Sequence, residues 1–317
     1  MKEKIIKIIK NPMNLLLALV FMVLLLYSIS IIFVFAWGMI TSLKSEIDFK
    51  DLGNYIGLPN FEWSKNEIFF GNYLAVFTGF NGTTISDQSY YSSLFGLITC
   101  EKIYITFGHL VFNSIFYAVI CTGVYVLTSM TVAYICAKYK FAFCEVIYNI
   151  VVIVMIIPIV GNYSSSIAVM KDLGLYNNYL GMIVQRISFT GMYFLLFYAF
   201  FQGIPDSFIE AAEIDGASQL SVYLKIIIPL STKIIGTVWL LMFIDAWNNY
   251  SVSIMYFPSL RVLAAAVYLV SYGGVRTIKG APAQISAAMI MAIPLILIFI
   301  VFRNKILGEI SMGGLKE

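Results

Sequence analysis

Long apolar runs without charged residues follow one another along this chain, separated by shorter polar segments. A membrane-spanning helix needs about 20 apolar residues to cross the hydrocarbon core of a bilayer. The runs meet that requirement, and their spacing predicts an all-α membrane protein with six transmembrane helices. The six predicted spans cover residues 13–40, 109–137, 146–170, 179–201, 226–257 and 282–302.

The composition agrees with lipid as the main solvent of the chain. Of its 317 residues, 60% are hydrophobic and only 12% are charged, and the mean hydropathy is +0.88. Soluble domains carry about 25% charged residues, so the composition excludes a soluble enzyme and a nucleic-acid-binding protein. The four cysteines show no CxxC or other metal-ligand spacing. We therefore expect them to be small core residues, not a disulfide framework or a zinc site.

The distribution of basic residues predicts how the spans are oriented. The first apolar run is longer than the about 15 residues of a cleavable signal peptide, so we expect an uncleaved first span. Cytoplasmic loops carry an excess of Lys and Arg. A cytoplasmic N-terminus puts eleven basic residues on that side and four in the opposite short loops, which predicts that both termini are cytoplasmic. The eleven are Lys2, Lys4, Lys7, Lys10, Lys138, Lys140, Lys225, Lys233, Arg303, Lys305 and Lys316.

The spans divide the chain into four predicted parts. Residues 1–40 hold the N-terminal segment and the first span, and residues 41–107 form an extracytoplasmic loop. Residues 108–302 form the transmembrane core, and residues 303–317 form a cytoplasmic tail. The loop mixes acidic and aromatic residues with turn signals, which predicts a small folded cap. A docking surface for an extracytoplasmic partner and a lid packed on the helix ends are equally consistent with it.

Proline interrupts two of the predicted spans. Pro158, with Gly161, lies in the middle of the third span, and Pro294 lies in the middle of the sixth. Proline removes a backbone hydrogen bond and kinks a helix. The two prolines therefore predict kinks, which would suit either a moving pathway or static packing.

The charges concentrate in one cytoplasmic segment, residues 204–229, between the fourth and fifth spans. Acidic residues such as Asp206 and Glu210 favour the N-terminal half of a helix, and Gly216 supplies the left-handed position that ends it. Ser218 or Gln219 can begin a second short helix. The segment therefore predicts two short helices joined at a glycine, although an amphipathic interfacial loop is the alternative.

The same segment resembles the EAA loop of ABC importer permeases. The pattern is EAA, three residues, G, nine residues, I, one residue, L, P, and the one departure is Ile228 where leucine is usual. The matching residues are Glu210, Ala211, Ala212, Gly216, Ile226 and Pro229. Asp215 flanks them as that family has it.

Further residues are similar to the MalG-like permeases of carbohydrate importers. Trp247 and Asn248 match a WN pair of that family, although Asn249 replaces the acidic residue that usually follows. The resemblance covers most of the chain but not residues 41–107. Other matching residues are Asn113, Ser114, Ala133, Tyr134, Met155, Ile156, Ile157, Pro158, Leu173, Gly174, Leu175, Ile204 and Pro205.

The resemblance implies a mechanism and a set of partners. In such importers the EAA loop sits in a cleft of a cytoplasmic ATPase, and closure of the ATPase dimer on ATP switches the transmembrane cavity from inward to outward facing. Glu210 is then expected to pair with a basic residue of the ATPase. A second permease subunit and an extracytoplasmic solute-binding protein complete the system. The sequence has no GxxxxGK[ST] motif, so the partner ATPase would bind ATP and Mg²⁺ and this chain would be non-catalytic.

Polar groups inside the predicted spans suggest a substrate path. Asp245, Asn248 and Asn249 occupy about one helical turn in the fifth span, and intramembrane ionisable residues often mark pathways. Amide, carboxylate and aromatic groups suit sugar rings, so we expect the path to include Asn113, Asp245, Trp247, Asn248, Asn249 and Tyr250. An internal hydrogen-bond network or a contact with the partner permease is the alternative.

Two other ionisable residues lie near the hydrocarbon. His109, at the start of the second span, is expected at the interface, and Arg186 either extends outward or pairs with Asp245 or a partner chain. A proton-coupled transporter could use Asp245 and Arg186, but it would leave the EAA loop unexplained. A membrane enzyme lacks a visible catalytic cluster. An importer of a non-sugar solute remains the nearest alternative to a carbohydrate importer.

Overall fold

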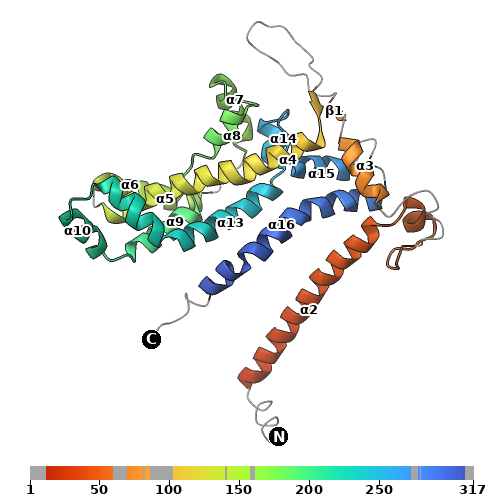
Figure 1. Cartoon of the computed structure of the whole chain (residues 1–317), viewed down its shortest axis with the longest axis horizontal. Helices are drawn as coiled ribbons and strands as arrows, with labels where there is room; N and C mark the ends of the chain where they lie inside the picture. Colours follow the sequence, from red (N-terminus) through yellow and green to blue (C-terminus); the bar gives the residue numbers. More distant parts are fainter. Residues whose placement is uncertain are drawn as a thin grey trace, which may run out of the picture. The chain divides into compact units, whose positions relative to one another are not determined.

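The computed structural model describes residues 12–59, 70–80, 83–85, 103–139, 141–157, 161–272, 278 and 280–310 (Figure 1). The described part is predominantly helical, as the sequence predicts. The chain forms two compact units: Met1–Gly79 with Gly273–Ala292, and Phe80–Tyr272 with Ile293–Glu317.

The first unit is built on the first predicted span. Helix α2 (Pro12–Ser42) has 31 residues, and its apolar side chains are exposed along most of its length, as expected for a helix solvated by lipid. Beyond it lie a π-helical turn η1 (Ile47–Asp51) and helix α3 (Gly71–Phe80). The side-chain amide of Asn72 donates hydrogen bonds of 2.8 and 2.7 Å to the carbonyls of Ser42 and Lys44.

The segment after α2 buries two charged groups. Lys44 and Asp48 are 1% and 3% exposed, and the Lys44 ammonium donates a 2.6 Å hydrogen bond to the carbonyl of Asn54. Burial lowers the pKa of Lys44, whereas the nearby Asp48 carboxylate raises it. This segment is folded against the end of α2, and the cap over residues 41–107 stays a prediction. Much of the loop 41–107 lies outside the described residues.

The second unit begins with a short antiparallel strand pair, β1 (Thr83–Ile85) and β2 (Ile103–Ile105), in which Thr84 faces Tyr104. This pair departs from the predicted all-α class. The helices that follow are α4 (Phe107–Ile115), η2 (Phe116–Cys121), α5 (Thr122–Lys138), α6 (Ala142–Ile156), α7 (Tyr163–Asp172), α8 (Tyr179–Gln185), α9 (Met192–Gln202), α10 (Ser207–Ile214), α11 (Gln219–Val222), η3 (Tyr223–Ile227), α12 (Ile228–Leu230), α13 (Thr232–Asn248), α14 (Ser251–Tyr256), α15 (Leu263–Ser271) and α16 (Ala281–Ile310), the last of which begins in the first unit.

Three of the six predicted spans are single helices, and three are broken. The first, second and sixth spans correspond to α2, to the continuous run α4–η2–α5, and to α16, which contains Pro294. The third ends as α6 at Ile156 and resumes as α7, with Pro158 itself outside the described residues. The fourth divides into α8 and α9, and the fifth is bent between α12 and α13. Within the described chain, three helices are long and apolar enough to cross a membrane, or five if each bent pair counts as one span.

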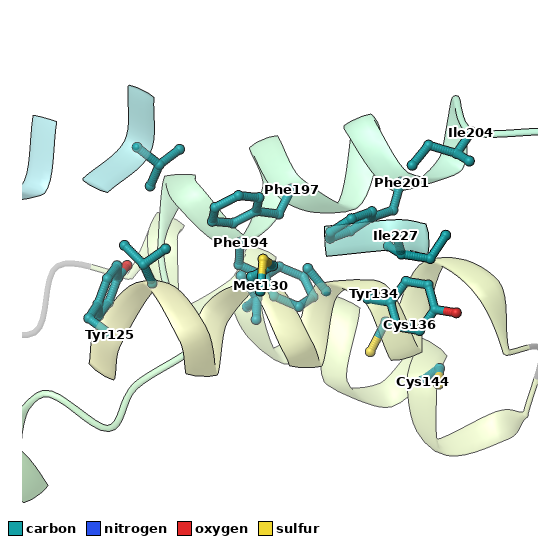
Figure 2. Packing of buried hydrophobic residues seen from close by; sticks show 14 of the residues in the cluster. Tyr125, Met130, Tyr134, Cys136, Cys144, Phe194, Phe197, Phe201, Ile204 and Ile227 are labelled. Carbon is teal, nitrogen blue, oxygen red and sulfur yellow. The ribbon is translucent and has the colours of Figure 1, made fainter. Parts of the chain in front are cut away.

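The core of the second unit lies where α5 and α9 pack along each other, with α6 and α13 beside α5. Phe194, Phe197 and Phe201 of α9 point toward Met130 and Tyr134 of α5 (Figure 2). The rings recur every three or four residues, which places them on one helix face. Cys121, Cys136 and Cys144 are buried free thiols, as expected of core residues, and Cys100 lies outside the described residues.

Candidate functional site

Residues 204–229 form the two short helices that the sequence predicts, and we call this segment the elbow. Helix α10 ends at Ile214 with Asp215 as its C-cap, and Gly216 follows with φ +79°. The Ala217 amide donates to the Ala212 carbonyl and the Gly216 amide to the Glu213 carbonyl, at 2.9 and 3.0 Å, which is the hydrogen-bond pattern of a left-handed helix end. The Ser218 hydroxyl then accepts a hydrogen bond from the Ser221 amide and begins α11.

The elbow turns sharply where it meets the apolar helices on each side. The angle between α9 and α10 is 66°, and the angle between the segment Gln219–Leu230 and α13 is 73°. The second helix of the elbow thus continues through η3 and α12 to Leu230 and includes Pro229 in its last turn. The chain bends at Ser231, a buried residue whose hydroxyl donates to the Ile227 carbonyl.

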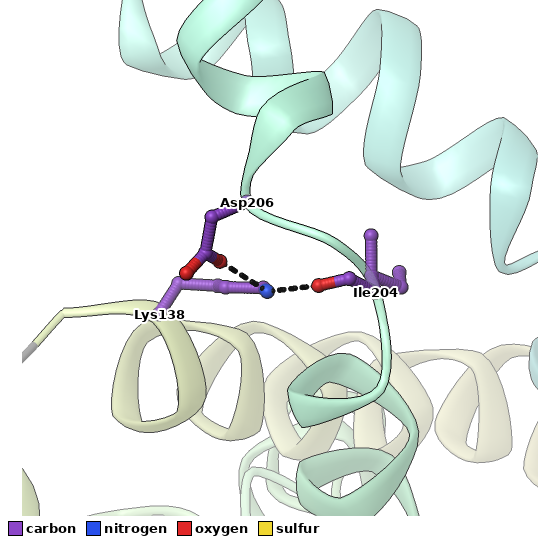
Figure 3. Close-up of polar contacts among 3 residues, drawn as sticks. All are labelled: Lys138, Ile204 and Asp206. Carbon is purple, nitrogen blue, oxygen red and sulfur yellow. Dashed lines mark hydrogen bonds and ion pairs between the residues drawn. The ribbon is translucent and has the colours of Figure 1, made fainter.

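Lys138, the last residue of α5, holds the start of the elbow (Figure 3). Its ammonium donates a 2.5 Å hydrogen bond to the Ile204 carbonyl and forms a 2.7 Å ion pair with Asp206. The Lys138 side chain is 6% exposed and that of Asp206 is 70% exposed. A nearly buried ammonium needs such partners, so this contact fixes the elbow to the end of the predicted second span.

Further hydrogen bonds join the second elbow helix to the end of α5 and the two elbow helices to each other. The Tyr139 hydroxyl donates to the Gln219 side-chain oxygen, and the Gln219 amide donates to the Glu213 carboxylate. The hydroxyls of Thr131 and Tyr223 share a 2.8 Å hydrogen bond. In the sequence, Lys138 is recognisable only as an orienting charge and Tyr139 does not stand out, because the partners of both residues lie far away along the chain.

The outer surface of the elbow is open and combines acidic with apolar groups. Phe208, Ile214 and Leu220 are 48%, 86% and 66% exposed. Of the residues that match the EAA pattern, Glu210, Ala211, Gly216 and Pro229 are exposed, and Ala212 and Ile226 are half-buried; the flanking Asp215 is exposed.

A small pocket opens between the elbow and the end of α5. It has a volume of about 280 Å³, and its lining includes the carboxylates of Glu210 and Glu213. The remaining lining residues are Lys138, Tyr139, Asp206, Ile209 and Gln219. Exposed apolar side chains beside an acidic pocket are typical of a protein-binding surface.

A second, polar pocket lies at the end of α13. It has a volume of about 400 Å³ and is lined by Ile244, Asp245, Asn248, Asn249, Tyr250 and Ser251. Four of the six predicted path residues therefore lie together. The positions of Asp245, Asn248 and Asn249, at i, i+3 and i+4, put them on one face of the helix end.

The structure does not bring the other two predicted path residues into this pocket. Trp247 is buried against Phe243, with ring centroids 5.8 Å apart. Asn113 is 2% exposed; its amide donates to the Arg261 carbonyl and accepts from the Tyr179 hydroxyl. Both side chains therefore have packing partners inside this unit.

Arg186 and His109 have local partners. The Arg186 guanidinium donates hydrogen bonds of 3.0 and 2.5 Å to the Tyr117 hydroxyl and lies over the Tyr117 ring. In the described part of the chain, no ion pair joins Arg186 to Asp245. His109 is exposed in the first turn of α4, where its ring contacts the Thr106 hydroxyl at 3.1 Å, and its interfacial position stays a prediction.

This chain is similar to a family of transport-system membrane components and to named permease proteins of bacteria. The family described as binding-protein-dependent transport system inner membrane component matches residues 129–307, more than half of the chain. The sulfoquinovosyl glycerol transport system permease protein SmoH of Agrobacterium fabrum is 24% identical over 88% of this chain and 87% of its own length. The trehalose transport system permease protein SugB of Mycobacterium tuberculosis is 25% identical over 66% of this chain and 77% of its own length.

Two further likenesses extend this result. The sn-glycerol-3-phosphate transport system permease protein UgpE of Yersinia enterocolitica is 28% identical over 59% of this chain and 66% of its own length. A chain of a bacterial ABC transporter involved in the import of the acidic polysaccharide alginate superposes with a TM-score of 0.65 at 21% identity, over 93% of this chain and 98% of that chain, and so has the same fold. The family match includes the whole elbow and both of its bends. This chain belongs to the binding-protein-dependent transport system inner membrane components, the permease subunits of importers in the bacterial cytoplasmic membrane.

Proposed function

We propose that this chain is one of two paired transmembrane subunits of an ATP-driven carbohydrate importer, and that the elbow couples ATPase closure to the transmembrane helices. The observation that carries this proposal is the elbow itself. Its outer surface is open, and hydrogen bonds and an ion pair fix it to the end of α5. A rigid projection of this kind transmits a push from a partner to the helices behind it.

The docking chemistry follows from the outer surface of the elbow. Ile214 and Leu220 supply apolar area for a protein partner, and the small, exposed Ala211 lets the backbone of that partner approach closely. Glu210 and Glu213 line the small pocket and offer carboxylates to a basic side chain of the ATPase. The ATPase dimer supplies ATP and Mg²⁺ binding and hydrolysis, whereas this chain supplies different contacts to its open and closed states.

The proposed substrate class is an oligosaccharide, delivered by an extracytoplasmic binding protein. The names of SmoH and SugB connect those relatives with a sulfoquinovosyl glycerol and with trehalose, and the transporter of similar fold is involved in the import of a polysaccharide. The polar pocket presents the amide and carboxylate groups that suit hydroxyl-rich solutes. UgpE, named for sn-glycerol-3-phosphate, favours a non-sugar organic solute as the second candidate.

Co-purification of the native complex tests the proposal. A tag on this chain is expected to bring down an ABC ATPase and a second permease, and Glu210→Lys is expected to release the ATPase while leaving the second permease bound. Asp172→Lys is a matched control, because Asp172 is an exposed acidic residue at the end of α7, outside the elbow. A chain that purifies alone and transports alone contradicts the proposal, as does a Glu210→Lys variant that retains the ATPase.

A further inference from the structure

Three tyrosine rings stand in a row beside the polar pocket. The rings of Tyr250 and Tyr268 are stacked with centroids 4.1 Å apart and planes 10° apart. The ring of Tyr272 lies 4.7 Å from that of Tyr268. Tyr268 and Tyr272 are four residues apart at the end of α15 and so share a helix face, whereas Tyr250 comes from the turn between α13 and α14. We call these three rings the tyrosine ladder.

The ladder is too exposed to be explained as core packing. Tyr272 is 76% exposed and Tyr250 is 40% exposed, whereas Phe194, Phe197 and Phe201 between α5 and α9 are fully buried. One face of the Tyr250 ring is occupied by Tyr268, and Tyr250 also lines the polar pocket. Exposed aromatic surface beside polar groups is typical of a ligand-binding site.

The polar groups beside the ladder offer both donors and acceptors. The Asn248 amide nitrogen donates to the Ile244 carbonyl, which leaves its side-chain oxygen as an acceptor in the pocket. The Asn249 side-chain oxygen accepts from the Val252 amide, which leaves its nitrogen as a donor. The Asp245 carboxylate, exposed in the same pocket, forms no ion pair and no hydrogen bond with the residues that the structure describes.

We propose that the tyrosine ladder and the polar pocket together bind the sugar rings of an oligosaccharide during passage. A pyranose ring has an apolar face of C–H groups and an edge of hydroxyls that both donate and accept hydrogen bonds. The apolar face of the sugar packs on tyrosine rings, while its hydroxyls form hydrogen bonds with Asp245, Asn248 and Asn249. Tyr268 and Tyr272 continue the aromatic surface beyond the pocket, so the site fits a chain of sugar rings better than a single one. This proposal rests on the proposed function, because it names the substrate contacts of that importer.

The experiment uses the purified complex of this chain with its partner permease and ATPase. The probe is a mixture of linear gluco-, galacto-, manno- and galacturono-oligosaccharides of two to six rings, observed by saturation-transfer NMR. Wild-type complex is expected to saturate the ring C–H protons of at least one oligosaccharide. Tyr268→Leu and Tyr272→Leu are expected to weaken that binding on the order of tenfold, the size of a strong aromatic contact. Tyr272→Phe keeps the ring and is expected to keep the affinity.

The matched control is Tyr163→Leu, which removes an exposed tyrosine of α7 outside the ladder and is expected to leave binding unchanged. If an intact complex binds none of the oligosaccharides, the ladder is not a sugar site, and the importer proposal is unaffected. The same conclusion follows if Tyr272→Leu binds oligosaccharide as tightly as the wild type. Loss of the partner permease from Tyr272→Leu would overturn the ladder as a sugar site and identify it as a subunit contact. Failure of the wild-type chain to bind an ATPase would instead overturn the proposed function.

Discussion

Lys138 shows how a single side chain can connect two functional parts of this permease. Its ammonium is nearly buried at the end of α5, and both of its partners belong to the start of the elbow. The ion pair itself contributes little, because Asp206 is mostly exposed and solvent screens it. The hydrogen bond to the Ile204 carbonyl matters more, since an unpaired buried carbonyl costs about 1 to 3 kcal/mol.

The first prediction concerns this lysine. Lys138→Met keeps much of the side-chain volume but removes both contacts, so we expect normal membrane insertion with looser coupling between the elbow and α5. The measurement is transport per ATP hydrolysed in proteoliposomes, which should fall severalfold. Lys138→Arg should restore most of the ratio, because its guanidinium can reach both oxygens. Asp206→Asn should have a small effect, and an unchanged ratio in Lys138→Met would show that the contact does not transmit force.

The second prediction concerns the polar pocket. Asn248→Ala removes one hydrogen-bonding group from an exposed position, so stability should change little while the apparent affinity for substrate in transport falls about two- to tenfold. Trp247→Ala is the informative comparison. Trp247 is buried, and loss of such a ring costs about 3 to 5 kcal/mol of stability, so this variant should lose expression and thermal stability instead. Unchanged uptake in Asn248→Ala at normal expression would remove this pocket from the path.

The polar pocket also shows which functional residues can be predicted from the sequence and which cannot. Asp245, Asn248 and Asn249 come together because helical spacing alone places them on one face. Trp247, two residues after Asp245, points to another face by the same rule, and its inclusion in the predicted path followed its residue type instead of its position. Asn113 and the tyrosine ladder depend on contacts between distant segments, such as that between Tyr250 and Tyr268, which no local pattern contains.

At the scale of elements, the elbow could be predicted almost residue by residue, whereas the continuity of the spans could not. Gly216 and Ser218 act through local backbone rules, and the structure places both as those rules require. In the fourth predicted span, α8 ends at Gln185 and α9 begins after Gly191, which has φ +125°. A hydropathy profile contains no information on backbone angles, so the apolar run of residues 179–201 predicts one continuous helix.

The third prediction tests why the elbow needs its glycine. A Cβ at Gly216 would meet no atom within 4 Å, so within the described part of this chain the obstacle is the positive φ, which costs an ordinary residue about 1 to 2 kcal/mol. Transport should therefore be highest in the wild type and fall through Gly216→Asn and Gly216→Ala to Gly216→Val. Asparagine comes first among the variants because it tolerates the left-handed region. ATPase co-purification and uptake measure the series. Asparagine as damaging as valine would show that close approach of the partner, not backbone angle, selects the glycine.

At the scale of the whole molecule, the number of membrane crossings depends on which of the broken helices span the membrane. The described chain has three long apolar helices, and two bent pairs raise that number to five. The helix α6 is also apolar but shorter. Six crossings require α6 to span with neighbouring residues, whereas five would leave it as a partial or re-entrant element.

The last prediction tests the parity of the crossings. The excess of basic residues predicts that both termini are cytoplasmic, and two termini on the same side require an even number of spans. Alkaline phosphatase fused after residue 317 should therefore be inactive, and green fluorescent protein fused there should fluoresce. Phosphatase inserted within residues 41–107 should be active and serves as the matched control in the same chain. An active phosphatase at the C-terminus would mean that one broken element does not cross. Helix α6 is the first candidate, because among the described helices it is apolar but short, and Pro158 follows its end in the sequence.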